Sequence, residues 1–244
     1  VLLLIMAVVS RFYDLGARAM SHDEINHVVP TYSLYTGRGY IFDPMSHGPL
    51  QFHLIALLFF FFTSNDFIAR LPHAIASILT IAMLWKWRGY LGRAGTLVAA
   101  LFTLISPFML YYGRYARNEA FVALFGVLTL FSILRHLETG KNRYLIMLTI
   151  ATVLHFTVKE TAFIYTAQAL LFLAIYFILR VTKLPWKRER LFNWFIIALA
   201  AGVLLASTAV GLGFYGRARS AADATLTSAP SIPGQVQDGA QLTG

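Results

Sequence analysis

The segment FNWFIIALAAGVLLASTAVGLGF, residues 192–214, contains 23 residues and no charged side chain. A helix of this length rises about 34 Å at about 1.5 Å per residue, which exceeds the roughly 30 Å hydrocarbon core of a bilayer. The whole chain is 58% hydrophobic and only 13% charged, whereas a soluble domain carries about 25% charged residues. These features predict an all-α integral membrane protein.

Five more stretches have the length and apolar character of membrane helices: 68–86, 94–112, 119–137, 143–158 and 160–181. The chain opens on a shorter apolar run, Val1 to Val9, which we interpret as the outer half of a first transmembrane helix whose beginning is missing. We therefore expect about seven transmembrane helices, the first truncated, within residues 1–215. Residues 216–244 are small and polar and are predicted to form a disordered tail.

Pro49 to Phe62 is apolar but too short to span a bilayer comfortably, and it fits a re-entrant or surface-lying helix better. If it stays outside, three short connections fall on the inner side. They hold the basic residues Lys86, Arg88, Arg93, Arg135, Lys141, Arg143, Arg180, Lys183, Lys187, Arg188 and Arg190. Because basic residues in short loops mark the cytoplasmic side, the N-terminus is expected inside and the loop 11–67 outside.

The first candidate site lies in that outer loop, in the sequence Ser21-His-Asp-Glu-Ile-Asn-His27. Ser21 and Glu24 have the spacing of a helix capping box, and acids in a first turn suit the helix dipole. Adjacent carboxylates beside histidines also suit a general base or a metal ligand. From the residues alone, both interpretations of Asp23 and Glu24 stand, and an amphipathic surface helix is expected after them in either case.

The second candidate site is Arg114-Tyr-Ala-Arg117-Asn-Glu119, at an outer membrane boundary. Two arginines among tyrosines can bind a phosphate, although interfacial Arg and Tyr are also ordinary membrane anchors. An acid entering a membrane segment, as Glu119 does, indicates function. Lys159 is expected on the same face, either in an ion-paired hairpin tip with Glu160 or as a ligand of an anionic group.

These motifs occur in a specific order: Asp23-Glu24, His47-Gly-Pro-Leu, Arg70-Leu-Pro, Gly92-Arg-x-Gly, Ser106-Pro-Phe, Tyr112-Gly-Arg-Tyr-Ala-Arg-Asn-Glu119 and Lys159-Glu160. This order resembles the N-terminal membrane module of the GT-C glycosyltransferases, over about residues 1–215. The most similar groups are the protein O-mannosyltransferases, the aminoarabinose transferases and a prokaryotic subgroup described as flippase-activity-associated. Members of these groups usually run to 400 residues or more.

The resemblance implies transfer of a sugar from a polyprenyl-phosphate donor to a lipid, glycan or protein acceptor, at the extracytoplasmic face of a prokaryotic plasma membrane. It implies that Asp23 and Glu24 are the catalytic acids. Further site residues implied by it are Glu119, His47 and His27. The donor phosphate is then expected at Arg114, Arg117, Lys159 and Arg70.

The partners expected are the lipid-linked donor, its acceptor and membrane lipids. The basic cluster 187–190 is better explained by orientation and anionic lipid than by nucleic acid. A divalent metal is a possible cofactor that the sequence leaves open. A transporter or flippase of lipid-linked sugars, and a non-catalytic scaffold of the same module, are the alternatives, and the few polar residues at mid-span favour the enzyme.

Overall fold

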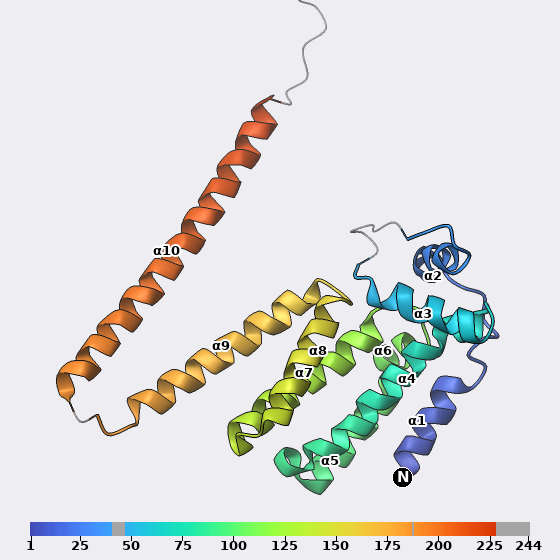
Figure 1. The fold of residues 1–244 in the computed structure, drawn as a ribbon, viewed down its shortest axis with the longest axis horizontal. Helices are drawn as coiled ribbons and strands as arrows, with labels where there is room; N and C mark the ends of the chain where they lie inside the picture. The colour runs from blue at the N-terminus through green and yellow to red at the C-terminus, as the bar shows by residue number, and fades with distance from the viewer. Residues whose placement is uncertain (41–46, 187, 228–244) are drawn as a thin grey trace, which may run out of the picture. The chain divides into compact units, whose positions relative to one another are not determined.

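The computed structural model describes residues 1–40, 47–186 and 188–227 (Figure 1). Within these ranges the chain forms α-helices and one short 3-10 helix, and it has no strand. Its contacts fall into two compact units, Val1–Ile175 and Tyr176–Gly244. The all-α class predicted from the sequence is confirmed.

The first unit is built around one central helix. Its elements are α1 (Leu2–Phe12), α2 (His22–Tyr35), α3 (Leu50–Phe61), α4 (Asp66–Leu84), η2 (Trp85–Trp87), α5 (Arg88–Ile105), α6 (Pro107–Tyr112), α7 (Glu119–Thr139), α8 (Asn142–Phe156) and the first part of α9 (Thr161–Thr182). Helix α4 contributes to three apolar clusters, which join it to α7 through Phe121, to α1 and α5 through Ile81, and to α3 through Ile55. Helix α2 in turn packs on α3, and α8 packs on α7, so α4 is the common support of this unit.

The helices α2 and α3 cross one end of this bundle instead of running along it (Figure 1). The buried face of α3 is apolar except for Gln51. It places Phe52, Ile55 and Phe59 against the rest of the unit. Its opposite side exposes Phe60 and Phe61. The short apolar stretch predicted not to span the membrane is thus a transverse helix with one buried face.

Four stretches of the described residues are long and apolar enough to cross a membrane: Asp66–Ile105, Glu119–Thr139, Thr161–Thr182 and Glu189–Arg217. The first is 40 residues long and includes the predicted span 68–86 and the larger part of the predicted span 94–112. Within it, Gly92 has a φ of 69°, in the left-handed region that glycine tolerates best, and divides α5 near the turn that follows α4. The predicted first and fifth spans correspond to the helices α1 and α8, which have 11 and 15 residues and are not among these four stretches.

The span predicted over 94–112 is wrong in one respect, because two helices occupy it. Helix α5 ends at Ile105, and α6 begins at Pro107. The side chain of Ser106 caps α6 by accepting a hydrogen bond from the Met109 N–H at 3.4 Å. Serine as N-cap followed by proline at the first helical position is a strong helix start, so the chain breaks here despite its continuous apolarity.

The second unit consists of the end of α9 and the long helix α10 (Glu189–Thr227). Its connecting turn is held by Trp186, whose indole N–H donates to the Val181 carbonyl at 3.0 Å and whose ring contacts Phe192 and Phe195. Helix α10 continues past the expected boundary at residue 215, because the alanines and arginines that follow are good helix formers. The rest of the predicted tail, 228–244, lies outside the described residues.

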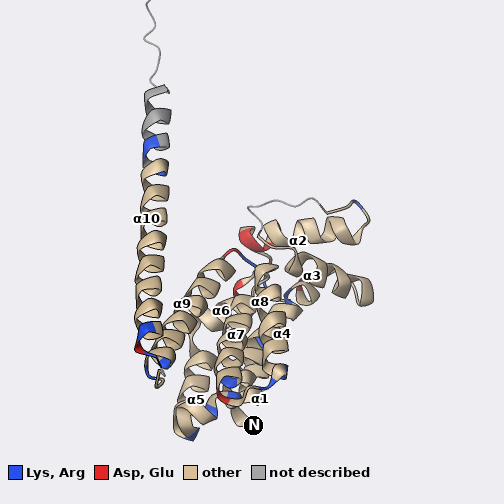
Figure 2. Cartoon of the chain, turned by 60° about the vertical axis from the view of Figure 1, so that its left-hand side comes forward, with Lys and Arg blue, Asp and Glu red and all other residues tan. Residues whose placement is uncertain are grey.

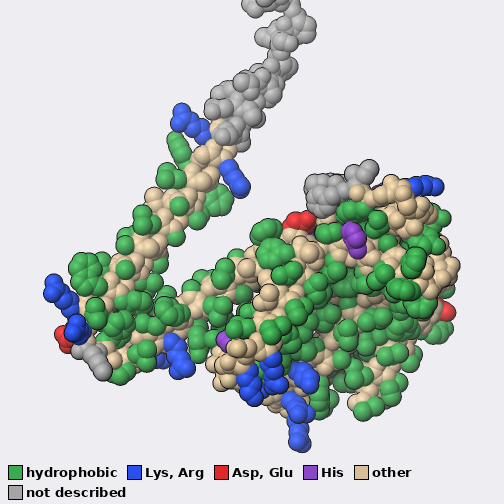
Figure 3. Space-filling view, in the orientation of Figure 1, with side chains coloured by type: hydrophobic (Ala, Val, Ile, Leu, Met, Phe, Trp, Pro, Cys, Tyr) green, Lys and Arg blue, Asp and Glu red, His purple; other side chains and the backbone are tan. Residues whose placement is uncertain are grey.

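Charge is distributed unequally between the two ends of the first unit. Figure 2 shows lysines and arginines at the turns from α4 to α5 and from α7 to α8, and acidic residues of α2 at the other end. Arg135 and Arg143 lie over the ring of Tyr144 at the basic end. Between the ends, hydrophobic side chains cover the visible face (Figure 3). This is the distribution expected of a body surrounded by lipid.

Candidate functional site

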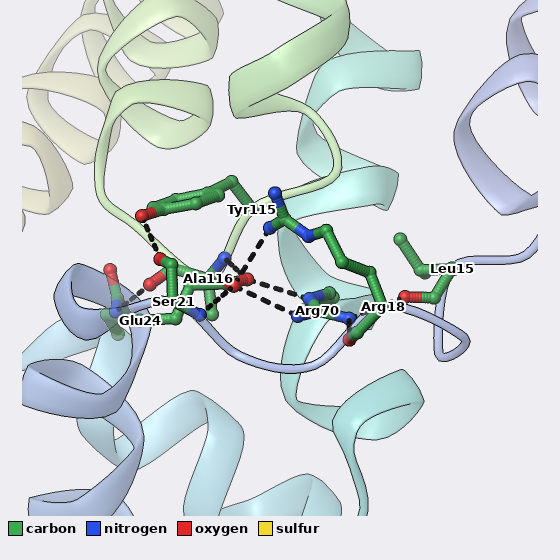
Figure 4. Close-up of polar contacts among 8 residues, drawn as sticks. Leu15, Arg18, Ser21, Glu24, Arg70, Tyr115 and Ala116 are labelled. Atoms are coloured by element: carbon green, nitrogen blue, oxygen red, sulfur yellow. Dashed lines mark hydrogen bonds and ion pairs between the residues drawn. The ribbon is translucent and has the colours of Figure 1, made fainter.

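The site is organised around Glu24, in the first turn of α2. Its side chain is fully buried. The backbone N–H of Ser21 donates to Glu24 Oε2 at 3.1 Å, which is the carboxylate half of the expected capping box. The Ser21 hydroxyl is also hydrogen-bonded to the Tyr115 hydroxyl (Figure 4). The capping interpretation of Glu24 therefore holds, but capping accounts for only one of its contacts.

Arg70 of α4 makes a two-pronged ion pair with the same carboxylate. Its Nε donates to Glu24 Oε1 at 2.7 Å and its Nη2 donates to Oε2 at 2.9 Å (Figure 4). The Nη1 group donates to the backbone carbonyls of Leu15 and Arg18, both at 2.9 Å. Arg70 is only 1% exposed. Each of its three nitrogens thus donates to a protein acceptor, and the two contacts with Glu24 hold that carboxylate in place.

Two more donors complete the shell around Glu24. Arg18 Nη2 donates to Oε2 at 2.9 Å, and the backbone N–H of Ala116 donates to Oε1 at 3.1 Å. Burial by itself would raise the pKa of Glu24, but the hydrogen bonds from Arg70, Ala116 and Ser21 outweigh it and hold the pKa below its usual value. Glu24 is therefore a firmly ionised anchor that joins α2 to α4 and to the connection between α6 and α7.

Asp23 faces a different environment from its neighbour. Its side chain is 49% exposed, and its Oδ2 accepts a hydrogen bond from Arg117 Nη1 at 2.6 Å. Arg117 Nε lies 3.5 Å from Glu119 Oε1, and that oxygen also accepts from Lys159 Nζ at 2.8 Å. The four side chains form a continuous line of alternating charge, which we call the Asp23–Lys159 line. It brings together four residues that the sequence placed on one face.

His47 connects this face to the turn between α8 and α9. Its Nδ1 lies 2.8 Å from Glu160 Oε2, and its ring stacks on that of His27 at a centroid distance of 6.2 Å. The neighbouring Gly48 donates its N–H to the Val158 carbonyl at 3.0 Å. The His-Gly-Pro-Leu motif thus holds the start of α3 against the Lys159–Glu160 turn.

The absence of a side chain at Gly48 permits this contact. A Cβ atom there would lie 2.2 Å from the Thr157 carbonyl oxygen, which is part of the backbone and has little room to move. We expect Gly48→Ala to destabilise the protein by about 1–3 kcal/mol, the usual cost of overpacking. The measurement is the thermal unfolding midpoint in detergent. Gly89→Ala, whose Cβ would meet nothing within 4 Å, is the control and should not lower the midpoint; an equal effect of both variants would contradict the assignment.

His27 is a buried titratable group next to the Asp23–Lys159 line. It is 5% exposed and its Nδ1 has no hydrogen-bond partner within the described structure. Burial and the charges of His47 and Arg117 lower the pKa of His27 to about 4, against the opposing effect of Glu119 and Asp23. His27 is therefore neutral at physiological pH.

This lowered pKa predicts acid sensitivity. Below the ordinary histidine pKa of about 6.5 the unfolded chain binds a proton that the folded chain does not, so stability falls as the pH drops from about 6.5 to about 4. The loss is of order 3 kcal/mol. We expect His27→Asn to flatten the dependence of the unfolding midpoint on pH in this window, and His53→Asn, at an exposed histidine, to leave it unchanged. A slope in His27→Asn as steep as that of the unmodified protein would contradict this cause.

A comparison with known protein families covers most of the helices described above. Residues 46–208 match the family of dolichyl-phosphate-mannose-protein mannosyltransferases, and this range is more than half of the chain. The chain belongs to this family. It is thereby a membrane glycosyltransferase of the mannosyltransferase type, with a polyprenyl-phosphate sugar donor. No curated protein matches the chain.

The family match confirms the predicted resemblance to the protein O-mannosyltransferases. Its range includes His47, Arg70, Glu119 and Lys159 but begins after Asp23 and Glu24. In this mannosyltransferase-family chain the ion pair between Glu24 and Arg70, and that between Asp23 and Arg117, connect the two acids to the matched part. The acidic motif and the family region are therefore joined by two ion pairs.

The structure adds site residues that the sequence analysis did not single out. Arg18 contacts Glu24, and its guanidinium lies over the rings of Tyr115 and Tyr111 at 5.3 and 5.9 Å. Arg11 is fully buried and donates to the carbonyl of Leu104 at 3.0 Å. A signal for such a polar interior was present in α4, where buried polar residues recur on one helical face. They are Arg70, His73, Ser77 and Thr80.

Metal binding was left open by the sequence. Among the described residues, no group of three or more His, Asp or Glu side chains is arranged as a metal site. Asp23 and Glu119 each face a cationic side chain instead. The part of the chain that the structure describes thus offers no such ligand set, and the chemistry below is derived from its side chains.

Proposed function

We propose that this site transfers a sugar from a polyprenyl-phosphate donor to a hydroxyl group of a lipid, glycan or protein acceptor. The observation that carries the proposal is the contrast between adjacent acids: Glu24 is fully buried and saturated with donors, whereas Asp23 is 49% exposed and opens to solvent. The family supplies the donor class. The exposed acid supplies a group that can accept a proton.

Asp23 is the general base in this proposal. It takes the proton of the acceptor hydroxyl as the acceptor oxygen forms a bond to the sugar carbon, and the bond from that carbon to the phosphate oxygen breaks with its electron pair leaving on the phosphate. Arg117 holds Asp23 through one carboxylate oxygen only. Glu24 and Arg70 position the first turn of α2 and with it Asp23.

The developing negative charge on the leaving phosphate requires cations nearby. Arg114, Arg117 and Lys159 are the proposed cations. Glu119 orients Arg117 and Lys159 through its two ion pairs. His47 and His27 support the same face. Such a phosphate lies at headgroup height because its prenyl chain is in the bilayer. The basic opposite end of the unit supports an extracytoplasmic site and a cytoplasmic N-terminus. The prokaryotic plasma membrane is part of the proposal and follows from the resemblance alone.

The test is transfer of labelled mannose by the purified protein from a polyprenyl-phosphate donor. We expect label in an acceptor fraction with the lipid-linked donor and none with the corresponding nucleotide sugar. Movement of labelled lipid across a liposome bilayer without a glycoside product would identify a flippase instead. Absence of both would indicate a non-catalytic module.

A further inference from the structure

Gln51, in the first turn of α3, is a buried polar side chain that the proposed chemistry does not use. It is fully buried, and the other buried residues of α3 are apolar. Its Nε2 donates to the Ala116 carbonyl at 3.3 Å, whereas its Oε1 has no hydrogen-bond partner within the described residues. A buried amide oxygen without a partner is less favourable than an apolar group of the same size. The stability of α3 therefore does not account for a glutamine at this position.

The Ala116 carbonyl belongs to the connection 113–118 between α6 and α7, which is not helical. Side chains from the cap layer hold this connection. The Ala116 N–H donates to Glu24 Oε1 at 3.1 Å, on the opposite side of the residue from its carbonyl (Figure 4). One residue earlier, the Tyr115 hydroxyl is hydrogen-bonded to Ser21. Contacts from the starts of α2 and α3 therefore fix this connection in place of a helix.

Arg117 leaves the chain at the peptide unit that Gln51 holds. The Ala116 carbonyl and the Arg117 N–H belong to one planar peptide unit, so a hydrogen bond to the carbonyl restricts rotation of the whole unit. From this backbone the guanidinium of Arg117 reaches Asp23 Oδ2 at 2.6 Å and lies 3.5 Å from Glu119 Oε1. The direction in which Arg117 points toward Asp23 therefore depends on Gln51.

The start of α3 is also attached to the turn between α8 and α9 that carries Lys159. The N–H groups of Gly48 and Leu50 donate to the carbonyls of residues 158 and 157, both at 3.0 Å. The start of α3 thus contacts both loops whose cations, Arg117 and Lys159, belong to the Asp23–Lys159 line. A change in its contacts would alter the position of one cation relative to the other.

We propose that Gln51 is a positioning residue for the transfer reaction and that it acts through Arg117. Its amide holds the Ala116 carbonyl, so that Arg117 stays aligned with Asp23, the proposed base, and with the site of the leaving phosphate. The inference rests on the proposed function for the reaction that is positioned. Misplacement of a catalytic group by about 1 Å can reduce a rate by about 10²-fold. A single hydrogen bond to the backbone beside Arg117 is therefore enough to affect transfer.

Gln51→Met tests this role, because methionine has a similar size but cannot donate to the Ala116 carbonyl. We expect it to lower kcat roughly tenfold or more without changing KM for the lipid-linked donor, since an interaction effective mainly in the transition state is lost. Its unfolding midpoint should stay within about 4 °C of the unmodified value, because the unpaired Oε1 is removed together with the hydrogen bond. Gln168→Met, the same substitution at an exposed position of α9, is the control and should retain activity.

A double variant with Arg117→Met shows whether Gln51 acts through Arg117. In that background Gln51→Met should change the rate by less than about twofold. A further loss as large as that seen in the otherwise unmodified protein would overturn the assignment. An unchanged rate together with a lower unfolding midpoint would make Gln51 a structural residue only.

Amide hydrogen exchange followed by mass spectrometry tests the positioning without requiring turnover. We expect Gln51→Met to speed exchange in the connection 113–118 several-fold, whereas the interior of α7 should exchange as in the unmodified protein. Unchanged exchange in 113–118 would overturn the inference. Faster exchange there, in a protein that transfers no sugar even when unmodified, would refute the proposed function and leave the positioning of this connection by Gln51 standing.

Discussion

Asp23→Asn should reduce sugar transfer by about 10²–10⁴-fold, the usual contribution of a positioned general base. The amide keeps the size of the side chain and can still contact Arg117, but it cannot accept the acceptor proton. Because Asp23 is half exposed and, within the described residues, forms an ion pair only with Arg117, folding should be nearly unaffected. The measurement is the initial rate of label transfer at saturating donor, together with the unfolding midpoint.

Asp66→Asn is the matched control for this variant. Asp66 is also an acid in the first turn of a helix, α4, but it lies outside the Asp23–Lys159 line. Its replacement should leave the transfer rate within about a factor of two, since it removes only a favourable helix-dipole interaction. Full activity in Asp23→Asn would remove Asp23 from the role of base.

Glu24→Gln should destabilise the protein by about 3–5 kcal/mol, because it leaves the buried guanidinium of Arg70 without a counter-charge. Activity should be lost along with the position of α2. The measurement is the unfolding midpoint in detergent. Acidification should act in the same direction: the lowered pKa of Glu24 means that its stabilisation is full above its ordinary pKa and disappears as the pH falls through the folded value.

Two further variants separate this effect from a general loss of charge. Glu138→Gln breaks the exposed ion pair with Arg135 at the basic end and should cost at most about 1 kcal/mol. The double variant Glu24→Gln/Arg70→Met removes both buried charges and should recover part of the lost stability without recovering activity. If Arg70→Met lowered the stability of the Glu24→Gln protein as much as it lowers that of the unmodified protein, the two residues would not be coupled.

The helices were largely predictable because apolar runs of bilayer length have few alternative structures. The break at Ser106 was missed because its serine and proline lie in a continuous apolar run, where a local helix start competes with span length. The extent of α10 was missed because small, polar residues beyond 215 were taken for disorder, although several of them are good helix formers.

The candidate site was predictable only as a set of residues on one face. Spacing placed Asp23 and Glu24 side by side but could not show that one is buried and the other exposed, since that depends on Arg70, which lies 46 positions away from Glu24 in the chain. Arg70 was expected at a phosphate because the sequence does not show that its partner is Glu24. Arg18 carries no local signal, and its role follows from the rings of Tyr111 and Tyr115.

The most direct test of sugar transfer is the release of the carrier itself. A polyprenyl-phosphate-mannose donor is incubated with the protein and acceptor, and free polyprenyl phosphate is quantified by mass spectrometry beside the labelled glycoside. We predict equal amounts of the two products with the unmodified protein and almost none with Asp23→Asn. Donor recovered intact in the presence of the unmodified protein and a competent acceptor would contradict the account.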